Sequence, residues 1–188
     1  MTTTTPTAPA ERNGVPVAKL FGTIEKVAAN PELGDFRFTA RNRWVEGTAS
    51  RSTIHEWYGA GADQVHVQEF AYNADHPTLG HGYGPTPHEF LLHALATCIT
   101  AGVATTAAAR KIELESIEST VRGEMDVRGI LGISDEVRNG FAKVTMDIEV
   151  KGDADADTLR SLVSASTRRS AVYDMMTNGT EVVINAAS

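Results

Sequence analysis

The chain of 188 residues is poor in cysteine, with Cys98 as its one thiol. A lone thiol cannot form an intrachain disulfide, and a structural zinc site needs several thiol or imidazole ligands. The opening residues, MTTTTPTAPAERNG, lack the basic segment and apolar core of a secretory signal. We therefore expect a protein without disulfides in a reducing, cytoplasmic location.

Positive charge is also scarce. Lys and Arg number 17 against 24 for Asp and Glu, which gives a net charge of −7. Proteins that bind nucleic acid or anionic lipid surfaces normally carry an excess of Lys and Arg. We expect neither a nucleic-acid nor a membrane partner. With 41% hydrophobic and 22% charged residues, the composition is typical of a soluble globular domain.

The chain divides into three segments by composition and periodicity. Residues 1–16 are mostly Thr, Pro and Ala, which predicts a disordered tail. Apolar residues then recur at helical spacing from Val17 to Val27 and stop at Asn30-Pro31 and Gly34, so 17–34 is predicted to be an N-terminal helical extension. Residues 35–188 form the main domain.

Period-two alternation dominates the main domain, which therefore belongs to the α+β class with helices against an antiparallel sheet. The helix at 155–169 is amphipathic, and 171–177 is predicted to be a short turn. The predicted strands cover 35–46, 48–58, 65–72, 117–128, 143–151 and 180–185, and a long loop covers 73–87.

A long helix is predicted from Pro87 to about Arg110. Thr86 and Glu89 form a capping box, and proline is favoured at the first helical position. The 20 residues Phe90–Ala109 are uncharged, which is long enough to span a membrane. They are mostly Ala, Thr and Gly, however, which gain little in lipid. We interpret this segment as a central core helix.

Cys98 lies inside this predicted helix and allows two interpretations. It is either a small buried hydrophobic residue or a reactive thiolate. The field of the helix N-terminus fades within the first turn, and Cys98 is about three turns further on. A thiolate there needs a nearby cation, for which an arginine from the sheet is the best source.

The six histidines match no zinc signature. His88 and His93 point in directions about 140° apart on a helix, so they cannot share a metal ion. His76 and His81 lie in the predicted loop and could chelate a metal with a third residue, which is the weakest of the functional hypotheses. We expect no metal and no other cofactor.

Three segments resemble the OsmC/Ohr family of osmotically inducible and organic-hydroperoxide-resistance proteins. The main one is Leu79-Gly-His-Gly-Tyr-Gly-Pro-Thr-Pro-His-Glu-Phe-Leu-Leu-His-Ala-Leu-Ala-Thr-Cys98, and 169–174 and 180–184 are similar to a second motif. The resemblance covers 35–188 and implies an intertwined homodimer. In it, an antiparallel sheet wraps a long central helix, and two sites lie at the subunit interface. The N-terminal helix resembles an extension of a longer subgroup.

The resemblance also implies roles for particular residues. Cys98 matches the cysteine that attacks a hydroperoxide, with an arginine and a glutamate holding the thiolate. The glutamate position, ten residues before Cys98, is His88 in this sequence, and the adjacent Glu89 is the candidate substitute. Arg51 is the best candidate for the arginine, and Arg43 is the second candidate.

The family's second, resolving cysteine falls at Ser170, which cannot form a disulfide. Oxidised Cys98 would then need an external thiol as its reductant. The leading hypothesis is a single-cysteine peroxidase acting on organic hydroperoxides. The rival is a non-catalytic homodimer that binds a small apolar ligand at its interface, with Cys98 lining the pocket.

Overall fold

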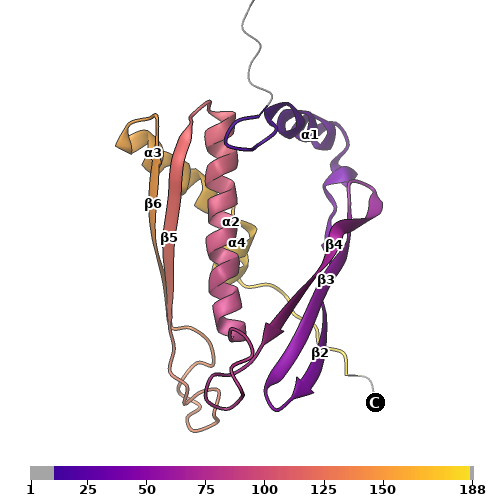
Figure 1. Ribbon diagram of the computed structural model, residues 1–188, viewed down its shortest axis with the longest axis vertical. Coiled ribbons are helices and arrows are strands. Elements are labelled where there is room, and N and C mark those ends of the chain that lie inside the picture. The colour runs from indigo at the N-terminus through magenta and orange to yellow at the C-terminus, as the bar shows by residue number, and fades with distance from the viewer. Residues whose placement is uncertain (1–10, 187–188) are drawn as a thin grey trace, which may run out of the picture. The chain divides into compact units, whose positions relative to one another are not determined.

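The computed structural model describes residues 11–186, which form two compact units. The sheet unit is Pro16–Leu91. The core unit contains residues 11–15 and 92–186 of the described chain. The chain passes from the sheet unit to the core unit inside one continuous helix, α2 (Pro87–Ala109) (Figure 1).

The sheet unit begins with helix α1 (Val17–Ala29), as the apolar spacing predicts. The helix ends at Asn30, and a single 3-10 turn, η1 (Pro31–Gly34), follows it. None of the 13 described residues of α1 is buried, and Phe21 and Ile24 are exposed. The helical extension is therefore confirmed as a helix, but its apolar side is only partly covered.

The rest of the sheet unit is, within its described residues, a four-stranded antiparallel sheet. Its long central strand β3 (Ala49–Gly59) pairs with β4 (Ala62–Ala74) and, at different points along its length, with β1 (Arg37–Phe38) and β2 (Arg41–Glu46). Gly47 and Gly61 have φ values of 50° and 82°, which the turns at the ends of β3 require. The predicted hairpin and third strand are confirmed.

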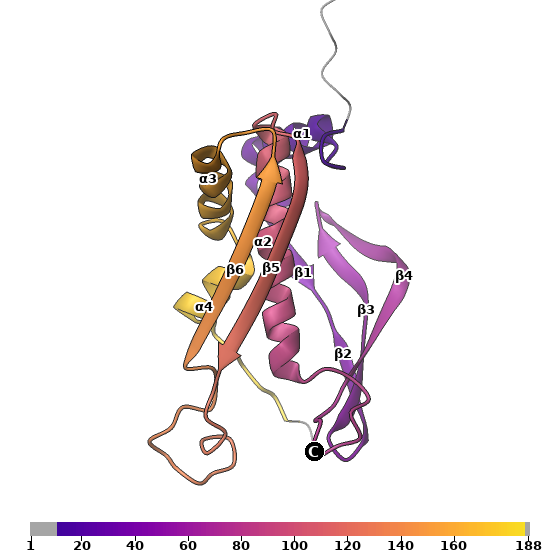
Figure 2. The ribbon, with the colours of Figure 1, turned by 60° about the vertical axis from the view of Figure 1, so that its left-hand side comes forward.

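The core unit combines a two-stranded antiparallel hairpin with helices. The hairpin consists of β5 (Leu114–Glu124) and β6 (Lys143–Gly152), with Val121 opposite Met146. Helices α3 (Ala156–Thr167) and α4 (Ala171–Asn178) follow along the chain, and Figure 2 shows them alongside the hairpin. The α+β class with antiparallel sheets is confirmed, although the strands of one chain form two separate sheets.

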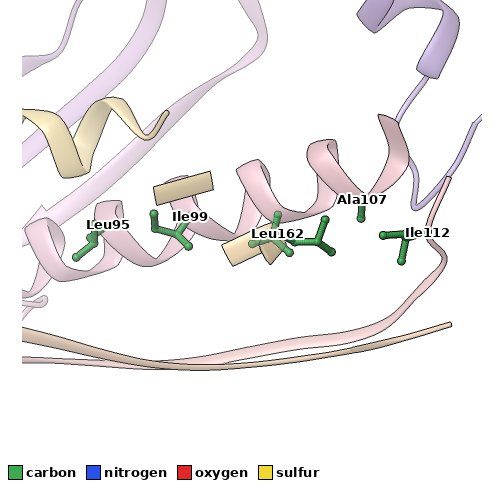
Figure 3. Packing of buried hydrophobic residues seen from close by; sticks show 6 residues of the cluster. Leu95, Ile99, Ala107, Ile112 and Leu162 are labelled. Carbon is green, nitrogen blue, oxygen red and sulfur yellow. The ribbon is translucent and has the colours of Figure 1, made fainter. Parts of the chain in front are cut away.

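The hydrophobic core lies between α2, α3 and the hairpin. Leu95, Ile99 and Val103 recur every four residues on one face of α2, and they pack with Leu162 of α3 (Figure 3). Val103 and Leu162 are 0% exposed. The apolar side chains of β5 and β6 cover this cluster from the hairpin side.

Small residues let α2 approach α3 closely. A Cβ atom added at Gly102 would lie 3.0 Å from the Cβ of Ser166. Although α2 is long and apolar enough to span a membrane by length and composition, with a mean hydropathy of 1.6, it supplies most of the buried core. The structure thus supports its interpretation as a core helix.

Two predictions near the C-terminus are wrong. Residues 171–177 are helical, not a turn, because Ser170 caps α4 by accepting a hydrogen bond from Tyr173 N (3.1 Å). Residues 180–185 form no strand in the described chain. Their apolar side chains are exposed, with Ile184 at 88%. A strand needs a neighbouring edge to satisfy its backbone groups, and no described strand pairs with this segment.

The strand predicted for 117–128 ends early. β5 stops at Glu124, because Asp126 Oδ1 accepts a hydrogen bond from Arg128 N (3.0 Å) and closes a turn. The Asp126 carboxylate also binds the Arg128 guanidinium, and this side-chain bond, with the backbone one, lowers the pKa of Asp126. Residues 125–128 therefore belong to the loop.

Most of the predicted N-terminal tail lies outside the described residues. Of its last residues, Arg12 and Val15 form an isolated bridge. The side chain of Asn13 donates to Ile112 O and accepts from Leu114 N, both at 2.9 Å. These bonds attach the segment to the link between α2 and β5.

Candidate functional site

Cys98 lies in the middle of α2, next to the core residue Ile99, and its thiol is free and half-buried. One turn further along, Gly102 contacts α3. The sulfur therefore sits at the edge of the core, where it meets the connection between α3 and α4. There the Oγ of Ser170 donates a hydrogen bond to Cys98 Sγ at 3.1 Å.

Ser170 is held firmly in this position. It is 5% exposed, and as the cap of α4 it accepts from Tyr173 N (3.1 Å) while its carbonyl accepts from Asp174 N (3.0 Å). The two residues lie 72 positions apart in the chain. The sequence resemblance places a resolving position at Ser170, and the structure brings that position into contact with Cys98.

Glu89 lies in the first turn of α2 and is engaged by Thr86. Glu89 Oε2 accepts from Thr86 N (2.7 Å) and Thr86 Oγ1 (2.9 Å), while Glu89 N donates to Thr86 Oγ1 (3.3 Å). These bonds, led by the backbone one, lower the pKa of Glu89. The predicted capping box is confirmed.

Glu89 and Cys98 are not brought together within one chain. They are nine residues apart on the same helix. That spacing separates them by about 13 Å along the axis and about half a turn around it. The Glu89 carboxylate therefore faces away from the sulfur of its own chain.

Arg51 lies on β3 in the sheet unit and is exposed. Its Nη1 donates to Asn73 Oδ1 on β4 at 3.1 Å. Arg43 lies directly opposite it on β2. In the described chain neither guanidinium meets a carboxylate, whereas the nearby Arg41 binds Glu56 at 2.6 Å. Like charges opposite each other destabilise a strand pair, so this pair is a cost to the folded chain.

Sequence reasoning missed the buried carboxylate of Asp75, which is 2% exposed. It accepts hydrogen bonds from Thr48 Oγ1 (2.6 Å), His76 N (2.7 Å), His81 N (2.9 Å) and Tyr83 N (3.2 Å). These bonds, with the Thr48 hydroxyl first, hold the pKa of Asp75 well below its usual range. Asp75 thereby organises the loop that leads into α2. Gly80 leaves room for this carboxylate, because a Cβ at that position would lie 2.0 Å from Asp75 Oδ1.

The two histidines of this loop, His76 and His81, make contacts within the loop. His76 Nδ1 accepts from Thr78 N (3.2 Å) and Leu79 N (3.0 Å), and His81 stacks on Tyr83 with ring centroids 5.0 Å apart. Among residues 11–186, no three or more His, Cys, Asp or Glu side chains gather to hold a metal ion.

An aromatic cluster lies on the strands of the sheet unit. Phe36 and Phe38 stack on Trp57, with ring centroids 5.8 and 6.5 Å away. Phe38 is nevertheless 78% exposed. A hollow of about 660 Å³ beside Trp57 is lined by Arg37 and Asp63 among others, and includes neither Cys98 nor Ser170. The cluster is an uncovered apolar surface of the sheet unit.

Solved structures share this fold. An OsmC-like protein from Mycoplasma pneumoniae matches with a TM-score of 0.58 and 14% identity, over 79% of this chain and 94% of that one. An OsmC-like protein of unknown function from Vibrio cholerae matches with a TM-score of 0.52 and 14% identity, over 73% and 92%. At these identities the likeness shows the fold alone.

A Legionella pneumophila structure described as an organic hydroperoxide resistance protein OsmC is also similar. It has a TM-score of 0.49 and 15% identity, over 76% of this chain and 91% of that one. No curated protein matches the sequence. The family model described as OsmC-like protein matches residues 80–185, which is more than half of the chain. The matched range contains all of α2 and the described core unit from residue 92 to residue 185. The chain therefore belongs to the OsmC-like protein family.

Proposed function

We propose that this OsmC-like protein is a cytoplasmic thiol peroxidase that reduces organic hydroperoxides with Cys98 as its nucleophile. The observation that carries the proposal is the half-buried sulfur of Cys98, which receives the hydroxyl hydrogen bond of Ser170 in a member of this family. A sulfur that is partly open to solvent and bound by a donor is suited to act as an anionic nucleophile.

The proposed first step is a two-electron oxidation of the sulfur. The Cys98 thiolate attacks the terminal oxygen of R–O–OH, an S–O bond forms and the O–O bond breaks. The alkoxide takes up a proton and leaves as the alcohol ROH. Cys98 is left as a sulfenic acid, which is the first and reversible stage of thiol oxidation.

The second step needs a thiol from outside the chain. The side chain beside the sulfur is the hydroxyl of Ser170, 3.1 Å away, and serine cannot form a disulfide. An external thiol attacks the sulfenic sulfur, water leaves, and a mixed disulfide forms. A second thiol of the reductant then attacks the reductant sulfur of this mixed disulfide, so that the oxidised reductant leaves as its disulfide and Cys98 is released as a thiolate.

We further propose that the working form is a homodimer. The exposed aromatic cluster with Phe38 and the exposed apolar residues Val182 and Ile184 favour a second copy as cover. A second copy would also offer Arg51 and Glu89 to the sulfur, which Glu89 does not reach within its own chain. In this arrangement Arg51 stabilises the thiolate and Glu89 orients the guanidinium.

The direct test is the consumption of cumene hydroperoxide with dithiothreitol as the reductant. We expect turnover by the natural sequence and only the uncatalysed rate with Cys98→Ser. Thr97→Ala is the matched control, because this exposed hydroxyl of α2 bonds only to backbone carbonyls of its own helix (His93 O, 3.0 Å). We expect this control to retain full activity.

Equal rates for the natural sequence and Cys98→Ser would contradict the peroxidase proposal. Should no hydroperoxide be consumed, native mass spectrometry of the purified protein tests the rival function. A small apolar molecule retained by the dimer would then favour a ligand-binding protein in which Cys98 lines the pocket.

A further inference from the structure

We infer that Ser170 is a positioning residue for Cys98. The Ser170 hydroxyl fixes the reactive sulfur and stabilises the anionic form of that sulfur by relaying the polarity of the α4 N-terminus. The inference rests on the proposed function, because it concerns how that same sulfur is activated. It assigns to Ser170 a role for which a hydroxyl is better suited than a resolving thiol, because a thiol is the weaker hydrogen-bond donor.

The direction of the Ser170 hydroxyl proton follows from the other bond of this hydroxyl. A serine hydroxyl has one proton to donate and two lone pairs to accept with. Ser170 Oγ already accepts from Tyr173 N at 3.1 Å. Its single proton is therefore left for Cys98 Sγ, also at 3.1 Å. The sulfur is the acceptor of this bond, as a thiolate would require.

The polarity comes from the helix behind the hydroxyl. α4 (Ala171–Asn178) begins directly after Ser170, and the amide of Tyr173 is one of the first-turn N–H groups that lack a partner inside the helix. These groups carry the partial positive charge of the helix N-terminus. A hydroxyl that accepts from such a donor is polarised and becomes a better donor itself. The chain Tyr173 N–H to Ser170 O–H to Cys98 Sγ thus transmits this polarity to the sulfur.

Within one chain, the Ser170 hydroxyl has little competition for the sulfur. Cys98 lies 11 residues after Pro87, about 16 Å from the start of its own helix, so that terminus does not act on it. Among residues 11–186, Ser170 is the one hydrogen-bond partner of the sulfur. Because Ser170 is 5% exposed, water has little access with which to replace it. Hydrogen bonds to a charged group are also stronger than those to a neutral one.

The experiment measures the rate of alkylation of Cys98 by iodoacetamide as a function of pH, using the full chain and intact mass as the readout. We expect Ser170→Ala to move the alkaline rise of the rate up by about one pH unit and to lower the rate at pH 7 roughly tenfold. Ser170→Thr keeps a hydroxyl and should stay within about twofold of the natural rate.

Asp155→Ala is the matched control for the loss of a helix cap. Asp155 caps α3 by accepting from Thr158 N (2.8 Å) and makes no bond to the sulfur, so its removal should leave the pH profile unchanged. If Ser170→Ala does not fold, Ser170→Gly replaces it, because glycine costs a helix N-cap little and has no hydroxyl. It should show the same shift as Ser170→Ala.

The inference is overturned if the variants without a hydroxyl keep the natural profile, if Ser170→Thr behaves like Ser170→Ala, or if Asp155→Ala shifts the profile equally. Alkylation uses no peroxide, so the two proposals fail separately. A shifted profile in a protein that consumes no hydroperoxide would support Ser170 and refute the peroxidase. An unshifted profile in a protein that does consume hydroperoxide would refute the role of Ser170 and support the peroxidase.

Discussion

The two units of the chain differ in how far they bury their large apolar side chains. In the core unit, Leu162 and Val103 are 0% exposed. In the sheet unit, Phe38, Trp44 and Val67 are 78%, 71% and 101% exposed. Helices α2 and α3 supply the buried cluster that the β5–β6 hairpin covers, whereas α1 has no buried residue of its own. The core unit thus buries an apolar cluster within one chain, although Val182 and Ile184 near its end are exposed, whereas Ala49 is the one buried apolar residue among the described residues of the sheet unit.

The largest effect should come from the core unit. Leu162→Ala removes a fully buried side chain and leaves a cavity, so we expect a loss of about 2–5 kcal/mol in the free energy of unfolding. Val67→Ala in the sheet unit should change it by less than about 0.5 kcal/mol. Urea titration followed by circular dichroism measures both. Similar losses for the two variants would contradict the view that apolar burial in the core unit supplies most of the stability.

The next effect concerns the uncovered aromatic cluster. Phe38→Asp places a charge on the surface that we expect to lie in the homodimer interface, so the protein should elute as a monomer in light-scattering chromatography. Ser164→Asp adds the same charge to an exposed site of α3 and should leave the dimer intact. A natural protein that is already monomeric, or a dimeric Phe38→Asp, would contradict the proposed assembly.

The local structure of both units could be predicted from the sequence to a large extent. The spacing of Val17 to Val27 and the Thr86–Glu89 capping box each depend on residues close together in the chain, and each is confirmed. Alternation likewise predicts the strands of both units, except for 180–185 and for the end of the strand at 117–128. The turn predicted for 171–177 failed because the cap supplied by Ser170 was not recognised as a helix start.

What the sequence could not predict depends on distant neighbours. The strand at 180–185 has the right composition, but composition does not supply an edge to pair with. The burial of Asp75 could not be predicted, because it depends on the hydrogen bond from Thr48, which lies 27 positions earlier in the chain. The contact between Cys98 and Ser170 was indicated by family resemblance, while no periodicity of the chain pointed to it.

Asp75 gives a smaller effect that is confined to the sheet unit. Its pKa is lower in the folded chain than in the unfolded one, so its carboxylate stabilises the fold above the unfolded value of about 3.9. This contribution is lost as the pH falls through the folded pKa. Asp75→Asn should therefore lower the melting temperature at pH 7 and remove part of the difference between pH 7 and strongly acidic solution.

Tryptophan fluorescence is the appropriate measurement, because Trp44 and Trp57, the two tryptophans of the chain, both lie in the sheet unit. Asp63→Asn is the control, since this exposed carboxylate on β4 makes no hydrogen bond within the described residues. An unchanged melting temperature for Asp75→Asn would show that the loop does not depend on this carboxylate.

The smallest effect should come from an exposed ion pair on the core unit. Arg122 binds Asp147 across β5 and β6, but the two side chains are 60% and 68% exposed. Such pairs contribute about 0–1 kcal/mol, and salt screens them. Arg122→Gln should therefore lower the free energy of unfolding by at most that amount, measured by urea titration in low salt. A loss as large as that of Leu162→Ala would mean that stability in this unit does not reside in its apolar core.

The proposed peroxidase activity requires that an organic hydroperoxide oxidises the thiol of Cys98. The most direct measurement exposes the protein to one equivalent of cumene hydroperoxide in the presence of dimedone, followed by peptide mass spectrometry. We expect one dimedone adduct on the peptide that contains Cys98 and none when the peroxide is left out. An unmodified Cys98 after complete mixing with the peroxide would contradict this activity.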